Sequence, residues 1–178
     1  LVPRVSEDGA LVDMLRQAGC RYARIAAVSL DEPARMIATN DRLGAVEVAN
    51  YLESLGHRRI GLITGPQRYL STRERGAGFM QALARRGIEL PPEHIVEGGY
   101  TFESGVAAAE RLLALDPRPT AIFTLNDEMA AGVYKAAFKM GLSIPDDLSV
   151  VGFDDSPLAA RLWPSLSSVR SAPCERVC

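Results

Sequence analysis

Short apolar runs that end on polar pairs constrain this 178-residue chain more than any other feature. One run, residues 121–125, leads into Asn126-Asp127, and a second ends on Asp154-Asp155. Runs of this length and β-branched content are typical of buried parallel strands, which deliver polar side chains to one edge of a sheet. Open α/β sheets bind ligands at that edge. We therefore expect Asn126 and Asp154 to face one cleft from two strand ends.

Strands and helices alternate along the rest of the chain. The pattern predicts helices near residues 10–18, 43–54, 71–86, 102–114 and 128–140, and strands near 22–28, 60–64, 94–96, 121–124 and 149–153. This alternation implies right-handed crossovers between parallel strands. The predicted class is therefore α/β, with helices covering both faces of a parallel sheet.

The composition excludes several classes of protein. The chain is 47% hydrophobic and 24% charged, which is ordinary for a globular protein, and its formal net charge is −2. Apolar runs fall far short of the roughly 20 residues of a transmembrane helix, so we predict no membrane span. An acidic chain lacks the clustered cations that DNA binding needs. Three cysteines without a Cys-x-x-Cys pair favour a reducing cytoplasm.

Cofactor and metal chemistry also find little support. The turn Gly65-Pro66-Gln67-Arg68 follows a predicted strand but matches neither glycine-rich phosphate pattern. Asp154-Asp155 could hold a metal or accept a phosphoryl group, but that chemistry needs acidic and basic companions that the sequence supplies only in part. We expect no catalytic residues, no metal and no cofactor.

Arg75 and Tyr100 are two further binding candidates. Arg75 opens a predicted helix, where its charge opposes the helix dipole unless it reaches an acceptor across the cleft. Its planar fork suits two adjacent hydroxyls or a carboxylate, although pairing with Glu74 or Glu110 on the surface is the alternative. Tyr100 lies between a strand and a helix, where its ring could stack on a sugar or a base, or pack in the core.

Several motifs, taken in order, resemble one protein family. They read Leu55-Gly56-His57-Arg58-Arg59-Ile60-Gly61, Arg75-x-x-Gly78-Phe79, Pro119-Thr120-Ala121, Asn126-Asp127-x-Met129-Ala130 and Ile144-Pro145-Asp146-Asp147-Leu148-Ser149-Val150-Val151-Gly152-Phe153-Asp154-Asp155. In this order and spacing they resemble the effector-binding core of the LacI/GalR family of bacterial transcriptional regulators. That core has the type I fold of periplasmic sugar-binding proteins.

The resemblance implies two Rossmann-like parallel-sheet subdomains with an effector bound between them. It implies that residues 1–56 form an incomplete N-terminal subdomain, residues 57–156 the C-terminal subdomain, and residues 157–178 a returning crossover and tail. The DNA-binding headpiece would lie upstream of residue 1. Operator DNA would then be contacted only through that absent headpiece, by a homodimer.

The resemblance also assigns binding roles. Arg75 looks like the effector-binding arginine, Tyr100 like the stacking aromatic, and Asn126 and Asp154 like the groups that take ligand hydroxyls. The resemblance also implies contacts from the turn and helix start after residues 60–64, and from the pair of residues before the 43–54 helix. These residues are Gln67, Ser71, Asn40 and Asp41. The family tends to read Asp-Asn where this chain reads Asn40-Asp41, so either of the two could face the ligand.

The leading hypothesis is a non-enzymatic sensing domain of a cytoplasmic transcriptional regulator that binds a small polar effector, which we expect to be a sugar. A cleft with a fork donor, an amide, a carboxylate and an aromatic ring satisfies both the hydroxyls and the apolar face of a pyranose. A periplasmic sugar-binding receptor of a transporter would share the fold. An α/β enzyme acting on a sugar or a phosphate ester is the third alternative.

Overall fold

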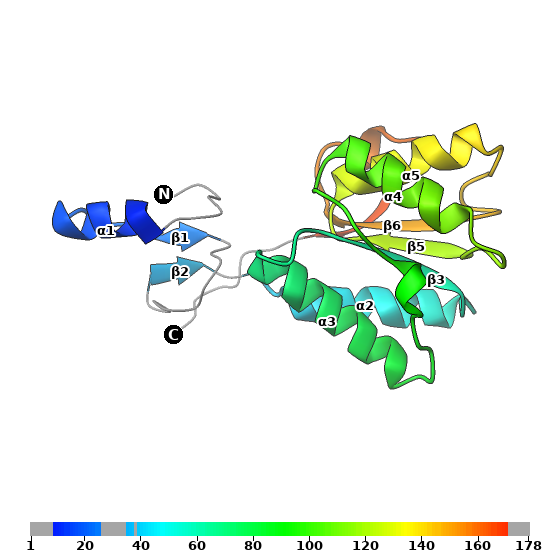
Figure 1. Ribbon diagram of the computed structural model, residues 1–178, viewed down its shortest axis with the longest axis horizontal. Helices are drawn as coiled ribbons and strands as arrows, with labels where there is room; N and C mark the ends of the chain where they lie inside the picture. Colours follow the sequence, from blue (N-terminus) through cyan, green and yellow to red (C-terminus); the bar gives the residue numbers. More distant parts are fainter. Residues whose placement is uncertain (1–8, 26–34, 38, 171–178) are drawn as a thin grey trace.

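The computed structural model describes residues 9–25, 35–37 and 39–170. The first part of this chain forms a small unit at one end of the molecule (Figure 1). It contains helix α1 (Gly9–Gln17) and two short parallel strands, β1 (Arg24–Ile25) and β2 (Met36–Ile37). The strand expected over residues 22–28 is observed as β1, and residues 26–28 lie outside the described residues.

A parallel sheet of five strands forms the centre of the larger part of the molecule. Its strands are β3 (Ile60–Thr64), β4 (Ile95–Glu97), β5 (Ala121–Thr124), β6 (Ser149–Asp154) and β7 (Ser167–Arg170). Their order in the sheet is β4-β3-β5-β6-β7, and every neighbouring pair is parallel. The chain therefore leaves β3 toward one edge and later returns to build the sheet in the other direction. The point of reversal lies between β3 and β5.

Helices cover both faces of this sheet (Figure 1). On one face, α2 (Asp41–Ser54) packs beside α3 (Leu70–Ala84), and on the other α4 (Phe102–Leu113) packs beside α5 (Asp127–Lys139). Two short 3-10 turns, η2 (Pro92–His94) and η3 (Ala159–Arg161), complete the connections. The α/β class with a parallel sheet is thus confirmed.

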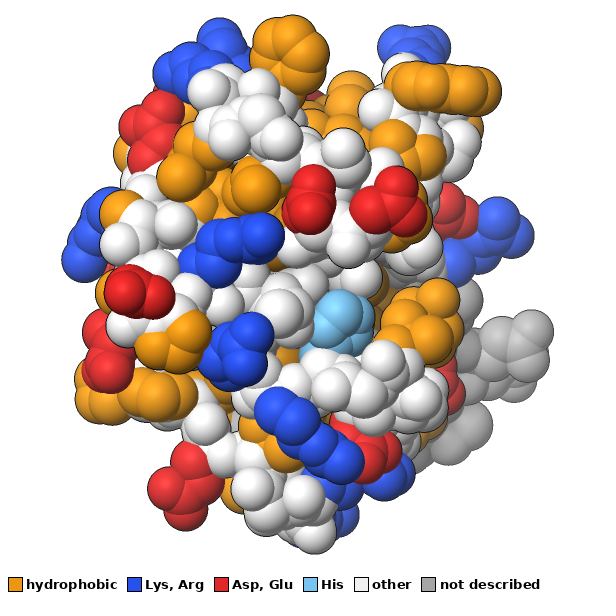
Figure 2. Space-filling model, turned by 90° about the vertical axis from the view of Figure 1, so that its right-hand side faces the viewer, with side chains coloured by type: hydrophobic (Ala, Val, Ile, Leu, Met, Phe, Trp, Pro, Cys, Tyr) orange, Lys and Arg blue, Asp and Glu red, His pale blue; other side chains and the backbone are white. Residues whose placement is uncertain are grey.

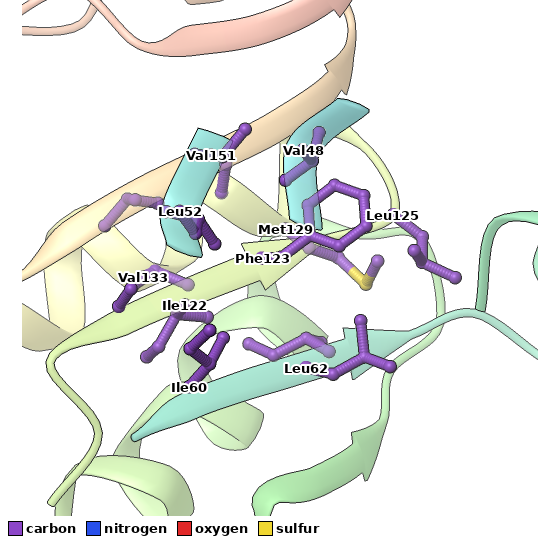
Figure 3. Close-up of a cluster of buried hydrophobic side chains, with 14 of the residues drawn as sticks. Val48, Leu52, Ile60, Leu62, Ile122, Phe123, Leu125, Met129, Val133 and Val151 are labelled. Atoms are coloured by element: carbon purple, nitrogen blue, oxygen red, sulfur yellow. The ribbon is translucent and has the colours of Figure 1, made fainter. Parts of the chain in front are cut away.

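The core lies where the strands meet the helices (Figure 3). Val48 and Leu52 of α2 are 4% and 0% exposed, and they pack among the buried side chains of the sheet, such as Ile60 and Phe123. Val133 of α5 belongs to the same continuous cluster. Because strands buried on both faces need apolar residues at successive positions, the unbroken apolar runs of β3 and β5 are explained.

Two elements outside residues 57–156 pack on the five-stranded sheet. Helix α2 lies within the segment expected to form the N-terminal subdomain, but its apolar face is part of the core of the five-stranded sheet. Strand β7 lies in the segment expected to be a returning crossover, and it pairs with β6 as the edge strand. A helix or a strand buries its apolar surface against another element of the fold, and the sequence pattern alone does not identify which element that is.

His57 connects the amino ends of β5 and β6, at the edge of the sheet opposite to Asn126 and Asp154. Its Nδ1 lies 2.9 Å from Thr120 Oγ1, and its Nε2 lies 3.0 Å from Ser149 Oγ. Partial burial removes water from the ring and lowers the pKa of His57 below its ordinary value. The neutral imidazole, which can donate through one nitrogen and accept through the other, therefore fits this position.

Within the described ranges, no helix is long and apolar enough to cross a membrane. Figure 2 shows the end of the molecule opposite the α1–β2 unit. Lys and Arg side chains are interspersed there with Asp, Glu and hydrophobic side chains. This face accordingly shows no continuous basic surface of the kind that binds nucleic acid.

Candidate functional site

The guanidinium of Arg75 is the centre of the candidate site. This side chain is 4% exposed, and each of its three nitrogens faces a protein oxygen. Nε donates to Asp41 Oδ1 at 2.7 Å, Nη1 donates to the Leu125 carbonyl at 2.5 Å, and Nη2 lies 3.1 Å from Asp154 Oδ1. The guanidinium carbon also lies 3.8 Å from the centre of the Phe153 ring. Arg75 thus joins the start of α2 to the carboxyl ends of β5 and β6.

Asp41, rather than Asn40, is the residue of its pair that reaches Arg75. Asp41 is the first residue of α2, where a negative charge is favoured by the helix dipole, and its Oδ2 accepts from Thr39 Oγ1 at 2.8 Å. Asn40 is exposed, and its side chain makes no capping bond to α2. It lines a cavity of about 150 Å³ beside the Phe153 ring. Because this chain reads Asn40-Asp41, the carboxylate of Asp41 accepts the hydrogen bond from Arg75.

The surface alternative for Arg75 is contradicted by the pairing of its expected partners. Glu74 accepts a hydrogen bond from Arg42 at 2.8 Å, and this bond lowers the pKa of the Glu74 carboxyl. Glu110 pairs with Lys139 at 3.0 Å. Both acids are therefore engaged by other cations while Arg75 points into the interior. Arg75 is the sixth residue of α3, so it lies beyond the first turn in which it was expected, and its acceptors come from α2 and from the ends of β5 and β6.

Tyr100 lies at the same edge of the sheet with a left-handed backbone, at a φ of 63°. Its ring packs directly over Gly65, where a Cβ atom would overlap the ring. Its hydroxyl is 2.6 Å from Thr72 Oγ1, and its ring centre is 5.8 Å from that of Tyr69. The half-buried ring therefore lies at the carboxyl edge of the sheet, against Gly65 and Thr72.

Asn126 caps helix α5 as well as lying at the carboxyl end of β5. Its Oδ1 accepts from the Met129 backbone N–H at 3.0 Å, and its Nδ2 donates to the Tyr100 carbonyl at 3.2 Å. An N-cap of this kind satisfies a helix N–H group that has no partner within the helix. The sequence analysis considered only a ligand-binding role for this amide, so the capping role is an additional finding.

The remaining expected site residues differ in exposure. Asp154 ends β6 with a φ of 108°, and its side chain is 35% exposed, so solvent reaches its carboxylate. Ser71 is buried in the first turn of α3. Gln67 is exposed, and its backbone carbonyl accepts from Arg73 Nη1 at 2.9 Å.

Asp127 is a further functional candidate, next to Asn126 at the start of α5. It is 1% exposed, and both of its oxygens accept hydrogen bonds. Oδ2 accepts from the Ser156 backbone N–H at 2.6 Å, and Oδ1 accepts from Ser168 Oγ at 2.6 Å. Across residues 9–25, 35–37 and 39–170, no group of three or more His, Cys, Asp or Glu residues could hold a metal ion.

The arrangement has the chemistry of a binding site. Arg75, Tyr100, Asn126 and Asp154 lie beyond or at the carboxyl ends of β3, β4, β5 and β6, next to the reversal point of the sheet, which is where open α/β sheets bind ligands. Arg75 forms ion pairs with both Asp41 and Asp154. An exposed carboxylate accepts from ligand hydroxyls, and an aromatic ring covers an apolar face.

Comparisons with known proteins agree with this fold. A family model described as a periplasmic binding protein-like domain matches residues 49–177. The HTH-type transcriptional repressor CytR of Escherichia coli K12 is 42% identical over 125 residues, which cover 70% of this chain and 37% of CytR. The chain therefore spans well under half the length of this relative.

Two solved structures share the fold at similar identity. A regulatory protein of the LacI family from Chloroflexus aggregans is 34% identical with a TM-score of 0.82, covering 90% of this chain and 58% of that one. A complex of the transcriptional regulator CelR with cellobiose is 32% identical with a TM-score of 0.83, covering 92% of this chain and 51% of that one. Both matches therefore cover at least nine-tenths of this chain.

Proposed function

We propose that this chain, which belongs to the LacI family of transcriptional regulators and forms part of their effector-binding domain, binds a sugar effector beside Arg75 and Asp154. The buried arginine between two carboxylates is the observation that carries this proposal. Because protein oxygens face all three of its nitrogens, Arg75 fixes Asp154 in position and offers the ligand only its remaining N–H groups. Asp154, which is partly exposed, is the main acceptor for ligand hydroxyls.

A saccharide fits these groups better than an apolar ligand does. A pyranose has hydroxyls along its edges and C–H groups on its faces. The Asp154 carboxylate suits the edge, and the half-buried Tyr100 ring suits a face. The CelR structure contains cellobiose, and its likeness to this chain supports the same class of ligand here.

The wider regulatory role follows from family membership. We propose that the whole protein acts inside the cell as a homodimer, and that it contacts operator DNA through a headpiece outside this chain. The effector would favour one orientation of the subdomains, which sets the spacing of the two headpieces. Reversing a 1:99 population requires a ligand preference of about 5.5 kcal/mol between the two states.

Neither alternative function gains an observation of its own. The matched family model describes periplasmic binding protein-like domains, which supports the fold shared by receptors and regulators. The relatives reported above are a repressor and regulators, which are not enzymes. The proposal therefore assigns no covalent chemistry to Asp154.

A thermal-shift screen tests the proposal. The protein is heated with monosaccharides, disaccharides, sugar phosphates and nucleobases, and we expect saturable stabilisation by one saccharide. A ligand at one hundred times its Kd stabilises the folded state by about 2.7 kcal/mol.

Two variants locate the binding. Asp154→Asn keeps the shape of the side chain but removes its charge, and we expect it to weaken binding by roughly 10-fold or more, since hydrogen bonds to charged groups are worth about 1.5–3 kcal/mol. Asp146→Asn changes an exposed acid in the loop before β6 and is the matched control. Equal affinity in the two variants would remove Asp154 from the site, and no response to any saccharide would refute the sugar proposal.

A further inference from the structure

The segment that follows Asp154 has an unusual backbone. Asp154 and Asp155 have φ values of 108° and 49°, so two successive non-glycine residues lie in the left-handed region. Side chains with a Cβ atom rarely adopt this conformation, because the Cβ crowds the backbone. Such a segment persists only when its surroundings hold it in place. The position of the Asp154 carboxylate therefore depends on whatever holds residues 154–156.

Two hydrogen bonds to the Asp127 carboxylate provide that support. Oδ2 of Asp127 accepts from the Ser156 N–H at 2.6 Å, and Oδ1 accepts from Ser168 Oγ at 2.6 Å. Ser168 Oγ in turn accepts from the Asp155 N–H at 3.0 Å. Bonds to an ionised carboxylate are shorter and stronger than those between neutral groups. The segment is thus held at two consecutive backbone N–H groups, directly by Asp127 and through Ser168 of β7.

The surroundings leave little room for any other arrangement. Asp127 is 1% exposed at the start of α5, so water does not compete for its oxygens. Gly152 lies directly against its Oδ1, where a Cβ atom would overlap the carboxylate. On the outer side, Arg170 donates to Asp155 Oδ2 at 2.7 Å.

We propose that Asp127 is a positioning residue of the effector site: its buried carboxylate sets the backbone of residues 154–156 against β7 and thereby aims Asp154 at the ligand. This inference rests on the proposed function for its consequence, which is effector affinity. The effect of Asp127 on the backbone of residues 154–156 does not depend on the ligand. The backbone conformation and the effector affinity are therefore measured separately.

Amide hydrogen exchange tests the effect of Asp127 on the backbone. Asp127→Asn keeps the size of the side chain but leaves a single acceptor oxygen, so one of the two bonds is lost. We expect exchange at the Ser156 or Asp155 amide to become roughly 10-fold faster, the change that corresponds to one hydrogen bond. Glu128→Gln is the matched control, because Glu128 is the next acid in the first turn of α5 and is exposed. Faster exchange along the whole of α5, without a local change at residues 155–156, would show a merely structural role and overturn the proposal.

Ser168 provides a second, milder pair of variants. Ser168→Ala removes the hydroxyl that the Asp155 N–H contacts but leaves the bond between Asp127 and Ser156. We expect the Asp155 amide to lose protection while the Ser156 amide keeps it. Ser168→Thr retains a hydroxyl and should restore the original exchange rates. Unchanged exchange rates at both amides in Ser168→Ala would overturn the inference, and so would unchanged rates at both amides in folded Asp127→Asn. The Ser168 result is sufficient by itself if Asp127→Asn does not fold.

Calorimetric titration with cellobiose tests the consequence for affinity. We expect about 10-fold weaker binding in Asp127→Asn and unchanged binding in Glu128→Gln. If the unmodified protein binds neither cellobiose nor any other saccharide of the thermal-shift screen while the exchange pattern changes as expected, the proposed function fails and the positioning of residues 154–156 stands. If a saccharide binds equally well to Asp127→Asn, Asp127 does not position the site.

Discussion

Replacing Arg75 by methionine should destabilise the fold strongly, because the change leaves buried charge without its partner. The Arg75 and Asp41 side chains are 4% and 11% exposed, and their atoms lie 2.7 Å apart. Removing one partner of a buried ion pair costs about 3–5 kcal/mol, mainly through the uncompensated charge that remains. Asp154 is 35% exposed, so solvent compensates most of its share. We therefore expect the free energy of unfolding to fall by about 3 kcal/mol or more.

A second substitution separates the lost charge from the lost packing. Asp41→Asn in the Arg75→Met background removes the stranded charge, so we expect it to recover a large part of the loss, whereas Asp41→Asn alone should destabilise. Urea unfolding followed by circular dichroism measures all of these values. Arg73→Met is the control, because Arg73 is exposed on the same helix, and it should cost less than about 1 kcal/mol. A loss below about 1 kcal/mol in Arg75→Met, or no recovery in the double variant, would refute the reasoning.

Three further predictions concern the site and the fold. Gly65→Ala places a Cβ against the Tyr100 ring and should displace it, so saccharide affinity in a titration should fall while the unfolding midpoint changes little; full affinity would show that the ring is not a binding surface. Gly152→Ala meets the buried Asp127 carboxylate and should cost about 1–3 kcal/mol in urea unfolding, with a cost near zero arguing against the close contact. Burial lowers the pKa of His57, so the unfolded state binds more protons below the ordinary value near 6.5. Stability should therefore be complete above that pH and fall as the pH drops below it. His57→Gln should lack this component of the pH dependence, and identical profiles for the two proteins would contradict it.

The order of strands and helices was predictable because the spacing of apolar residues along the sequence differs between helices and buried strands. Strands β3 and β5 were expected at residues 60–64 and 121–124 and are observed there, since buried parallel strands read as short unbroken apolar runs. The ends of all five predicted helices agree with the observed ends within two residues. The sequence pattern was less informative about which sheet each helix packs against. The period of residues 43–54 predicts a helix with one apolar face but does not say which sheet that face will meet.

Strand β7 shows a second limit of pattern. Its sequence, Ser167–Arg170, contains one strongly apolar residue and shows no alternation of buried and exposed positions, so it has no signal of its own. Its strand conformation comes from pairing with β6, which supplies the ladder of backbone hydrogen bonds. An edge strand of this kind is determined by tertiary context rather than by propensity.

The site was predictable in its strand-end residues and less so in its internal pairing. Asp154 was expected from its strand end and Arg75 from its planar fork near the start of a helix, and the structure brings them within 3.1 Å of each other. The choice between Asn40 and Asp41 depends on where α2 begins relative to the arginine, which spacing does not give. The buried role of Asp127 was missed because its partners, at residues 156 and 168, are distant in sequence.

Amide chemical-shift mapping with the saccharide that most stabilises the protein tests the central claim most directly. Two-dimensional NMR spectra are recorded during titration of that saccharide into the protein. The account predicts that the largest changes fall on residues at the carboxyl edge of the sheet, around Tyr100, Asn126 and Asp154, and that they saturate together. Changes confined to the groove lined by Tyr51 and Ile144, with an undisturbed carboxyl edge, would contradict it.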